Sequence, residues 1–277
     1  MKHTEGRFTG LKGLSIYHQS WLPDAEPKAV LLVVHGWAEH GGRYGNLVNY
    51  IVPRGYGVYA LDLRGHGKSE GMRGYIDRFT DYLPDVKTFF DIVRGEHPNR
   101  KVILFGHSMG GTVATTYTIR YQEGLAGLLL SGASLVVGPS LSSPLVPLAR
   151  VLSVFLPKLG VTVLDASTIS RDKAVVDAYV SDPLVYRGKI TCRFGAEMLK
   201  TLGRLPSEMS QISIPLLIMQ GTDDKLSDPG GSRLLYERAV SKDKTLKLYD
   251  GFYHEILNEP GRAQVLADME AWLAART

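Results

Sequence analysis

Cysteine is almost absent from this chain of 277 residues, which contains only Cys192. A single cysteine excludes a disulfide within the chain, and it excludes a zinc site built from cysteines. This composition agrees with a reducing compartment. We therefore expect a cytoplasmic protein in which Cys192 is a packed or half-exposed thiol.

Long apolar runs are also missing. The longest ones, residues 29–34 and 125–130, have the length of strands and fall far short of the roughly 18 apolar residues of a membrane-spanning helix. Residues 1–7 lack the apolar segment of a signal peptide. We therefore expect any contact with lipid to be peripheral.

Charge of one sign is not in strong excess. The chain has 32 Lys and Arg against 28 Asp and Glu, a formal net charge of +4, and its basic residues form no run. This pattern gives no indication of a nucleic-acid partner. The phosphate-binding pattern G-x-x-x-x-G-K-[ST] is absent, and no His, Asp or Glu cluster has convincing metal-ligand spacing. We expect no cofactor and no metal, and the oligomeric state stays open.

Short apolar runs alternate with helical patterns along most of the chain. This alternation predicts a mainly parallel, doubly wound α/β sheet. It stops between residues 134 and 206, where helical pieces and a proline-punctuated apolar segment replace the strands. We expect a base domain of residues 1–133 and 207–277, with residues 134–206 as an inserted helical cap. The expected strands are 14–21, 29–34, 57–61, 101–105, 125–130, 215–219 and 245–249, and the expected helices of the base domain are 47–54, 79–97, 111–120, 231–239 and 263–275.

The segment Gly106-His107-Ser108-Met109-Gly110 is the most informative feature that is present. With 30 glycines in the chain, the G-x-S-x-G pattern alone is weak evidence. Here it stands between an expected strand and an expected helix, which is the setting of a nucleophile elbow. The sharp turn would expose the Ser108 hydroxyl beside a helix N-terminus, which favours negative charge.

A serine hydroxyl needs a base to take its proton and a carboxylate to orient that base. His254 is the only histidine after Ser108, and it directly follows the expected strand at 245–249. Asp223 and Asp224 follow the expected strand at 215–219. Adjacent residues of a loop point in different directions, so only one of the two can hold the histidine, and the pattern leaves both open.

An acyl-transfer intermediate also needs two N–H donors for its oxyanion. One is expected from Met109, the residue after the nucleophile. The backbone N–H of Trp37, in the His35-Gly36-Trp37 loop after the expected strand at 29–34, is the natural second donor. The indole of Trp37 is also a candidate for simple core packing.

Six segments together make the chain resemble the monoglyceride lipases of the α/β-hydrolase superfamily, over nearly its whole length. The segment that begins at His35 and the Ser-Asp-Pro-Leu segment are more specific to this family than the other four. The segments are His35-Gly36-Trp37-Ala38-Glu39-His40 with Gly42-Arg43-Tyr44, Arg64-Gly65-His66-Gly67-Lys68-Ser69, Gly106-His107-Ser108-Met109-Gly110-Gly111, Ser181-Asp182-Pro183-Leu184, Gly221-Thr222-Asp223-Asp224 and Tyr253-His254.

The resemblance implies an α/β-hydrolase fold and cleavage of monoacylglycerol to glycerol and a fatty acid through an acyl-enzyme. It implies Asp224 as the acid, and it places Glu39, Arg43 and Tyr179 near the glycerol headgroup. An internal salt bridge that shapes the loop is an equal alternative for Glu39 and Arg43. Leu257 departs from the pattern, because some animal members carry a second histidine there.

Three other functions stay open at this point: a broader carboxylesterase, a lysophospholipase, and a non-catalytic relative that only binds a ligand or partner. Leu145, Leu148, Val151, Leu152 and Phe155 fall at helical spacing within the expected cap. Such a stripe fits an acyl tunnel or a membrane-touching surface, and core contact explains part of it. We therefore expect a lipid ester substrate, and peripheral membrane contact through the cap stays open.

Overall fold

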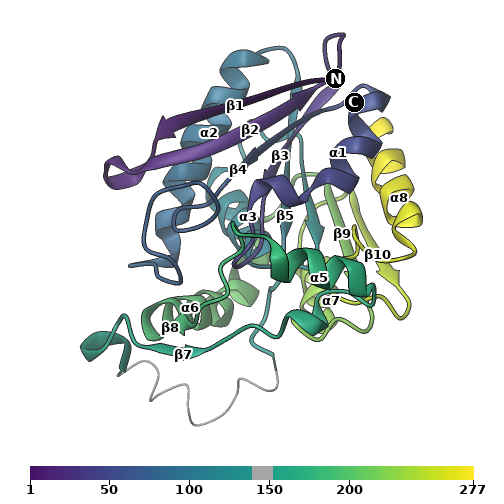
Figure 1. The fold of residues 1–277 in the computed structure, drawn as a ribbon. Helices are drawn as coiled ribbons and strands as arrows, with labels where there is room; N and C mark the ends of the chain where they lie inside the picture. The colour runs from purple at the N-terminus through teal and green to yellow at the C-terminus, as the bar shows by residue number, and fades with distance from the viewer. Residues whose placement is uncertain (139–151) are drawn as a thin grey trace.

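The computed structural model describes residues 1–138 and 152–277, and its centre is a sheet of eight strands in the order β1-β2-β4-β3-β5-β6-β9-β10 (Figure 1). From β4 to β10 the neighbouring strands are parallel, whereas β1 and β2 form an antiparallel hairpin at one edge. The predicted α/β class is confirmed. The strands are β1 (Lys2–Thr9), β2 (Ser15–Leu22), β3 (Ala29–Val34), β4 (Gly57–Leu61), β5 (Lys101–His107), β6 (Gly127–Ser131), β9 (Leu216–Gly221) and β10 (Lys244–Tyr249).

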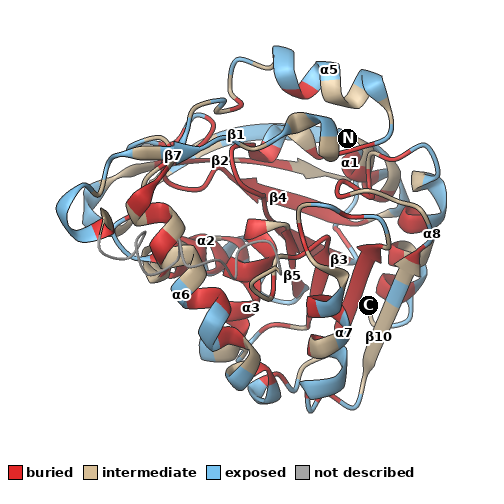
Figure 2. Cartoon of the chain, turned by 90° about the horizontal axis from the view of Figure 1, so that it is seen from below, coloured by how far each residue is buried: buried red, intermediate tan, exposed pale blue. Residues whose placement is uncertain are grey.

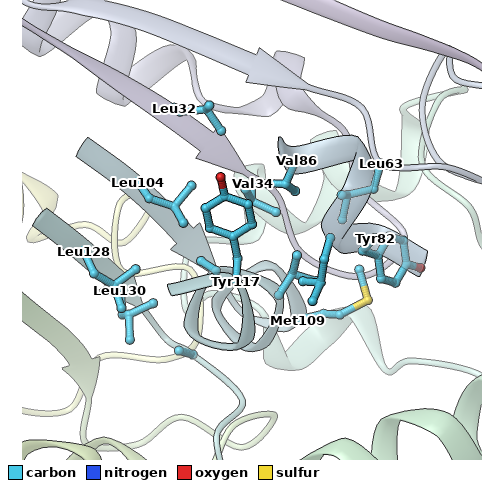
Figure 3. Close-up of a cluster of buried hydrophobic side chains, with 14 of the residues drawn as sticks. Leu32, Val34, Leu63, Tyr82, Val86, Leu104, Met109, Tyr117, Leu128 and Leu130 are labelled. Carbon is cyan, nitrogen blue, oxygen red and sulfur yellow. The ribbon is translucent and has the colours of Figure 1, made fainter. Parts of the chain in front are cut away.

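Helices cover both faces of the sheet because successive strand residues point to opposite sides. Leu32 of β3 belongs to the apolar layer that includes Tyr117 of α3, whereas Leu31 belongs to the layer that includes Met269 of α8. Figure 3 shows Tyr117 among side chains of the parallel strands. The α-helices that lie wholly within the described residues are α1 (Gly45–Ile51), α2 (Tyr82–Glu96), α3 (Met109–Tyr121), α5 (Lys173–Ser181), α6 (Cys192–Glu208), α7 (Pro229–Arg238) and α8 (Arg262–Ala274).

Two of the expected helices are observed partly as 3-10 turns. The expected helix 47–54 becomes α1 followed by a 3-10 turn at Val52–Arg54, because Pro53 cannot donate a helical hydrogen bond. The expected helix 79–97 likewise begins with a 3-10 turn. In the part of the chain that the structure describes, the 3-10 helices are Leu11–Gly13, Gly41–Arg43, Val52–Arg54, Phe79–Asp81, Ala166–Thr168 and Met209–Gln211.

Strand β1 was not predicted, because its sequence is largely polar and its residues are mostly exposed. A second pairing, between the short strands β7 (Gly160–Thr162) and β8 (Ile190–Thr191), was also not predicted. Figure 1 shows β7, β8, α5 and α6 gathered at one end of the main sheet. Figure 2 shows the central strands buried, whereas α5 is largely exposed.

Among the described residues, no helix is long and apolar enough to cross a membrane.

Candidate active site

Ser108 stands at the turn between β5 and α3, in a conformation that few residues adopt. Its backbone angles are φ 54° and ψ −123°, and such a geometry costs a non-glycine residue on the order of 1–3 kcal/mol. The flanking glycines make the turn possible: a Cβ at Gly106 would lie 2.6 Å from the carbonyl oxygen of Gly110. The local sequence thus folds into the strained elbow that the G-x-S-x-G pattern predicts, with Ser108 half-buried.

Asp224 and His254 are brought together from the ends of two adjacent strands. The carboxylate Oδ2 of Asp224 lies 2.8 Å from Nδ1 of His254, and both side chains are buried. The other oxygen, Oδ1, accepts the backbone N–H groups of Leu226 and Ser227. Asp223 is exposed and its carboxylate faces the Thr222 hydroxyl at 3.3 Å. Of the two candidate acids, the geometry therefore pairs Asp224 with the histidine.

The electrostatics of this pair follow from burial and opposite charge. Burial disfavours the charged form of each group. The charge of Asp224 and its hydrogen bond outweigh burial at His254 and raise the pKa of the imidazole above its ordinary value. In the same way, despite burial, His254 and the two N–H donors lower the pKa of Asp224. The pair is therefore suited to hold a proton on Nδ1 and to stabilise an imidazolium.

Ser108 and His254 are connected through the end of β6. The Ser108 N–H donates to the carbonyl of Ser131, and a Cβ at the next residue, Gly132, would lie 3.3 Å from Nδ1 of His254. The ring of His107 lies 4.8 Å from that of His254. In the ranges 1–138 and 152–277 the Ser108 hydroxyl makes no hydrogen bond to His254. Such contacts are often long without a substrate and tighten in the reacting complex.

Two chain segments meet at Ser108, and each carries one of the two backbone N–H groups expected at the oxyanion. Those of Trp37 and Met109 donate to no protein group among the described residues. A Cβ at Gly36 would lie 3.0 Å from the Ser108 Cβ, so the Trp37 loop touches the elbow directly. The indole of Trp37 packs against Phe194 at 4.1 Å, so its side chain serves the core while its N–H stays available.

His35 fixes this loop, a role that the sequence pattern did not indicate. Its Nε2 accepts the Leu63 N–H, and its Nδ1 therefore donates to the Gly36 carbonyl at 2.7 Å. Complete burial lowers the pKa of His35 to about 3, so the ring stays neutral.

Glu39 and Arg43 form a buried ion pair. The Nη1 of Arg43 donates to Glu39 at 2.9 Å, and the guanidinium also makes two hydrogen bonds to Glu255. The ring of Tyr179 lies 4.7 Å from the guanidinium carbon. The internal salt bridge, one of the two alternatives for Glu39 and Arg43, is therefore present.

Tyr179 reaches the site from α5. Its side chain also lines a cavity of about 160 Å³ that Trp37 and Leu164 border. Tyr179 therefore shares a cavity with Trp37, and the loop that carries Trp37 also touches the Ser108 turn.

Gln220 and Glu255 are site residues that the sequence reasoning missed. Gln220 is fully buried at the end of β9, and its amide donates to Oδ2 of Asp224 at 2.8 Å, while the Ser232 hydroxyl donates to its Oε1. A lone polar residue in an otherwise apolar strand was the available signal. For Glu255 the signal was only its position beside His254.

No group of three or more His, Cys, Asp or Glu side chains suited to a metal ion occurs in the part of the chain that the structure describes.

The chain is similar to known proteins over nearly its whole length. The model of the serine aminopeptidase S33 family matches residues 25–261. The monoacylglycerol lipase of Mycolicibacterium smegmatis is 37% identical, over 98% of this chain and 97% of its own. The human monoglyceride lipase is 35% identical, over 96% of this chain and 88% of its own. The solved structure of a Paleococcus ferrophilus monoacylglycerol lipase is 32% identical, covers 100% of both chains and superimposes with a TM-score of 0.82.

Proposed function

Since this chain belongs to the monoglyceride lipase family of the α/β-hydrolase superfamily, we propose that it is a serine hydrolase that cleaves monoacylglycerol into glycerol and a free fatty acid. The observation that carries the proposal is the meeting of three features at the carboxyl ends of the parallel strands. These are the strained Ser108 elbow, the buried Asp224–His254 pair and the N–H groups of Trp37 and Met109, which have no partner within residues 1–138 and 152–277.

The proposed reaction begins with attack of the Ser108 Oγ on the ester carbonyl carbon. Nε2 of His254 takes the hydroxyl proton, and Asp224 holds the imidazole and stabilises its charged form. The N–H groups of Trp37 and Met109 bind the resulting oxyanion. When the tetrahedral intermediate collapses, the C–O bond to glycerol breaks and His254 gives its proton to the leaving alkoxide oxygen.

Water completes the cycle. It attacks the acyl-Ser108 ester as His254 removes its proton, and the second tetrahedral intermediate collapses to a fatty acid and free Ser108, which recovers its proton from His254. No cofactor takes part in this sequence. Tyr179 contacts the glycerol headgroup in this proposal, since it borders the cavity beside the Trp37 loop.

We also propose that residues 134–206 form the cap and that this cap contacts the membrane surface. Among the described cap residues, large apolar side chains are exposed in a short stretch, with Val154 at 64% and Phe155 at 77%. Of the expected stripe, Leu145, Leu148 and Val151 lie outside the described residues. We define the exposed cap patch as Val154, Phe155, Leu156, Leu159, Val161 and Val163.

Hydrolysis of a panel of esters tests the proposed function. The panel contains monoacylglycerols, diacylglycerols, lysophospholipids and short p-nitrophenyl esters, and a fluorophosphonate probe reports the reactive serine. We expect labelling of the parent protein and its highest kcat/KM on monoacylglycerol. The matched variant Ser108→Ala should lose labelling and activity, by roughly 10⁶-fold in kcat. If the parent is labelled but prefers lysophospholipid, the proposed substrate, monoacylglycerol, is wrong and the serine mechanism stands. If the parent is neither labelled nor active, the hydrolase mechanism is overturned.

A further inference from the structure

Resting on the proposed function, we infer that Arg43 is a positioning residue that joins the oxyanion loop to the loop of the catalytic histidine. It does so through two carboxylates, Glu39 on one side and Glu255 on the other. In this role Arg43 acts on the geometry of the reacting groups and makes no contact with the glycerol headgroup.

The Arg43 guanidinium is held from three directions. Its Nη1 lies 2.6 Å from Glu255 Oε1 and 2.9 Å from Glu39 Oε2, and its Nη2 lies 3.0 Å from Glu255 Oε2. One face is covered by the ring of Tyr179. Its side chain is 10% exposed, and those of both glutamates are 5% exposed. Such a forked, desolvated arrangement fixes an orientation that a single-point contact would not.

Glu39 transmits this position to the oxyanion loop. Its Oε1 accepts the Gly36 N–H at 2.6 Å and the Tyr44 hydroxyl at 2.9 Å. Gly36 directly precedes Trp37, whose N–H we assign to the oxyanion. A displacement of Glu39 therefore moves the peptide that precedes the donor.

Glu255 transmits the same position to the base. It directly follows His254, and its Oε2 also accepts the Asn258 amide at 2.7 Å. Asn258 in turn accepts the Asn46 amide at 2.8 Å, which ties the histidine loop to α1. Arg43 and Glu255 are 212 positions apart in the sequence, so their contact joins two segments that the chain itself does not connect.

The space around these groups does not favour headgroup binding by Arg43. The cavity that Glu39, Arg43 and Glu255 line together has a volume of about 20 Å³. That is room for about one water molecule, far less than glycerol requires.

The cluster also has a charge consequence. Two carboxylates against one guanidinium leave one net negative charge buried near His254. Burial acts to lower the pKa of His254, but the charged groups that act on the ring, Asp224, Glu255 and Glu39, outweigh burial and raise this pKa. The His107 ring lies nearby, and a charge on it would oppose a charge on His254. Removal of one carboxylate should therefore change the pH dependence of the base as well as its position.

Two variants separate position from charge. Arg43→Lys keeps the positive charge but loses the forked guanidinium that bonds to both glutamates. Glu255→Gln keeps the size of the side chain and removes the net negative charge of the cluster. Glu26→Gln is the matched control, because Glu26 is an exposed partner of Arg100 before the start of β3, whereas the oxyanion loop follows the other end of that strand. Each variant is assayed against pH on a p-nitrophenyl ester, which has no glycerol, and on monoacylglycerol, with thermal unfolding as the check on folding.

We expect Arg43→Lys to lower kcat on both substrates to a similar degree, on the order of 10–100-fold, with little change in KM. We expect Glu255→Gln to move the acid limb of kcat/KM to lower pH, and Glu26→Gln to match the parent. If Arg43 instead binds glycerol, Arg43→Lys will raise KM for monoacylglycerol and spare the p-nitrophenyl ester. That result would overturn the inference.

Two other outcomes also decide the matter. If Arg43→Lys and Glu255→Gln both fold and differ from the parent only in thermal stability, the cluster has a structural role only. That result would overturn the inference and leave the proposed function standing. A parent protein without esterase activity would overturn the proposed function, and the inference with it. If one variant fails to fold, the other still gives a deciding result, because each has its own readout.

Discussion

Gly110 and Val34 approach each other so closely that no side chain fits between them. A Cβ built at Gly110 would lie 2.1 Å from the carbonyl oxygen of Val34 and 2.3 Å from that of His35. The first turn of α3 therefore rests directly on the end of β3. This contact brings the Met109 N–H and the Trp37 loop, which follow the elbow serine and β3 respectively, to the same place.

Gly110→Ala should destabilise the fold because the clash is with backbone atoms that cannot rotate away. We expect a loss of about 3 kcal/mol in the free energy of unfolding, measured by urea denaturation. Gly203→Ala is the matched control. Gly203 is exposed within α6 and a Cβ there meets nothing within 4 Å, so alanine should stabilise by about 0.5–1 kcal/mol. Equal effects of the two substitutions would contradict the close approach.

Asp224→Asn should cost far more activity than Asp223→Asn. The amide would present the wrong partner to Nδ1 of His254, which changes the imidazole tautomer and lowers kcat on the order of 10⁴-fold. Asp223 is exposed, so its variant should keep kcat within about threefold of the parent. Steady-state kinetics on a soluble ester measure both, and a dead Asp223 variant beside an active Asp224 variant would assign the acid to the other residue.

The pH dependence of kcat/KM should follow the titration of His254. Only the neutral ring can take the Ser108 proton, and its pKa is raised above the ordinary value of about 6.5. Activity should therefore be full at high pH and be lost as the pH falls through a midpoint above about 6.5. A profile on a substrate that does not itself titrate gives the midpoint, and a value clearly below 6.5 would be inconsistent with the buried Asp224–His254 pair.

The exposed cap patch should contribute to binding of lipid vesicles. Burial of a large apolar side chain in lipid is worth roughly 1.5–3 kcal/mol, so Val154→Ser with Phe155→Ser should weaken partitioning by more than tenfold. Activity on monoacylglycerol in vesicles should fall with it, while hydrolysis of a soluble short ester stays unchanged.

Val240→Ser controls for the loss of exposed apolar surface elsewhere, since Val240 is 58% exposed outside the cap. It should bind vesicles as the parent does. Vesicle sedimentation decides the question: a double variant that sediments like the parent would remove membrane contact from the proposal and leave the hydrolase mechanism intact.

The sequence was sufficient for the central sheet because its inner strands are buried on both faces and therefore read as continuous apolar runs, as β3 does. It was insufficient for β1, whose charged and polar residues are held by pairing with β2 rather than by burial. The elbow could be predicted because a strained turn demands glycine at fixed spacing.

The candidate site was harder to predict where it depends on contacts distant in sequence. The residue pattern left Asp223 and Asp224 open and only the family resemblance favoured Asp224, because the hydrogen bonds that distinguish the two form in the folded loop. The same holds for Glu255, because nothing near it in the sequence indicates that Arg43 is its partner.

The order of the chain also bears on synthesis. Ser108 follows β5 and is therefore synthesised well before the partner that would activate it, His254, which follows β10. Nascent or truncated chains that end before His254 therefore carry a nucleophile without its base. On the proposed mechanism, an incomplete polypeptide cannot attack the lipids around it, and ester cleavage begins only when the final strand has joined the sheet.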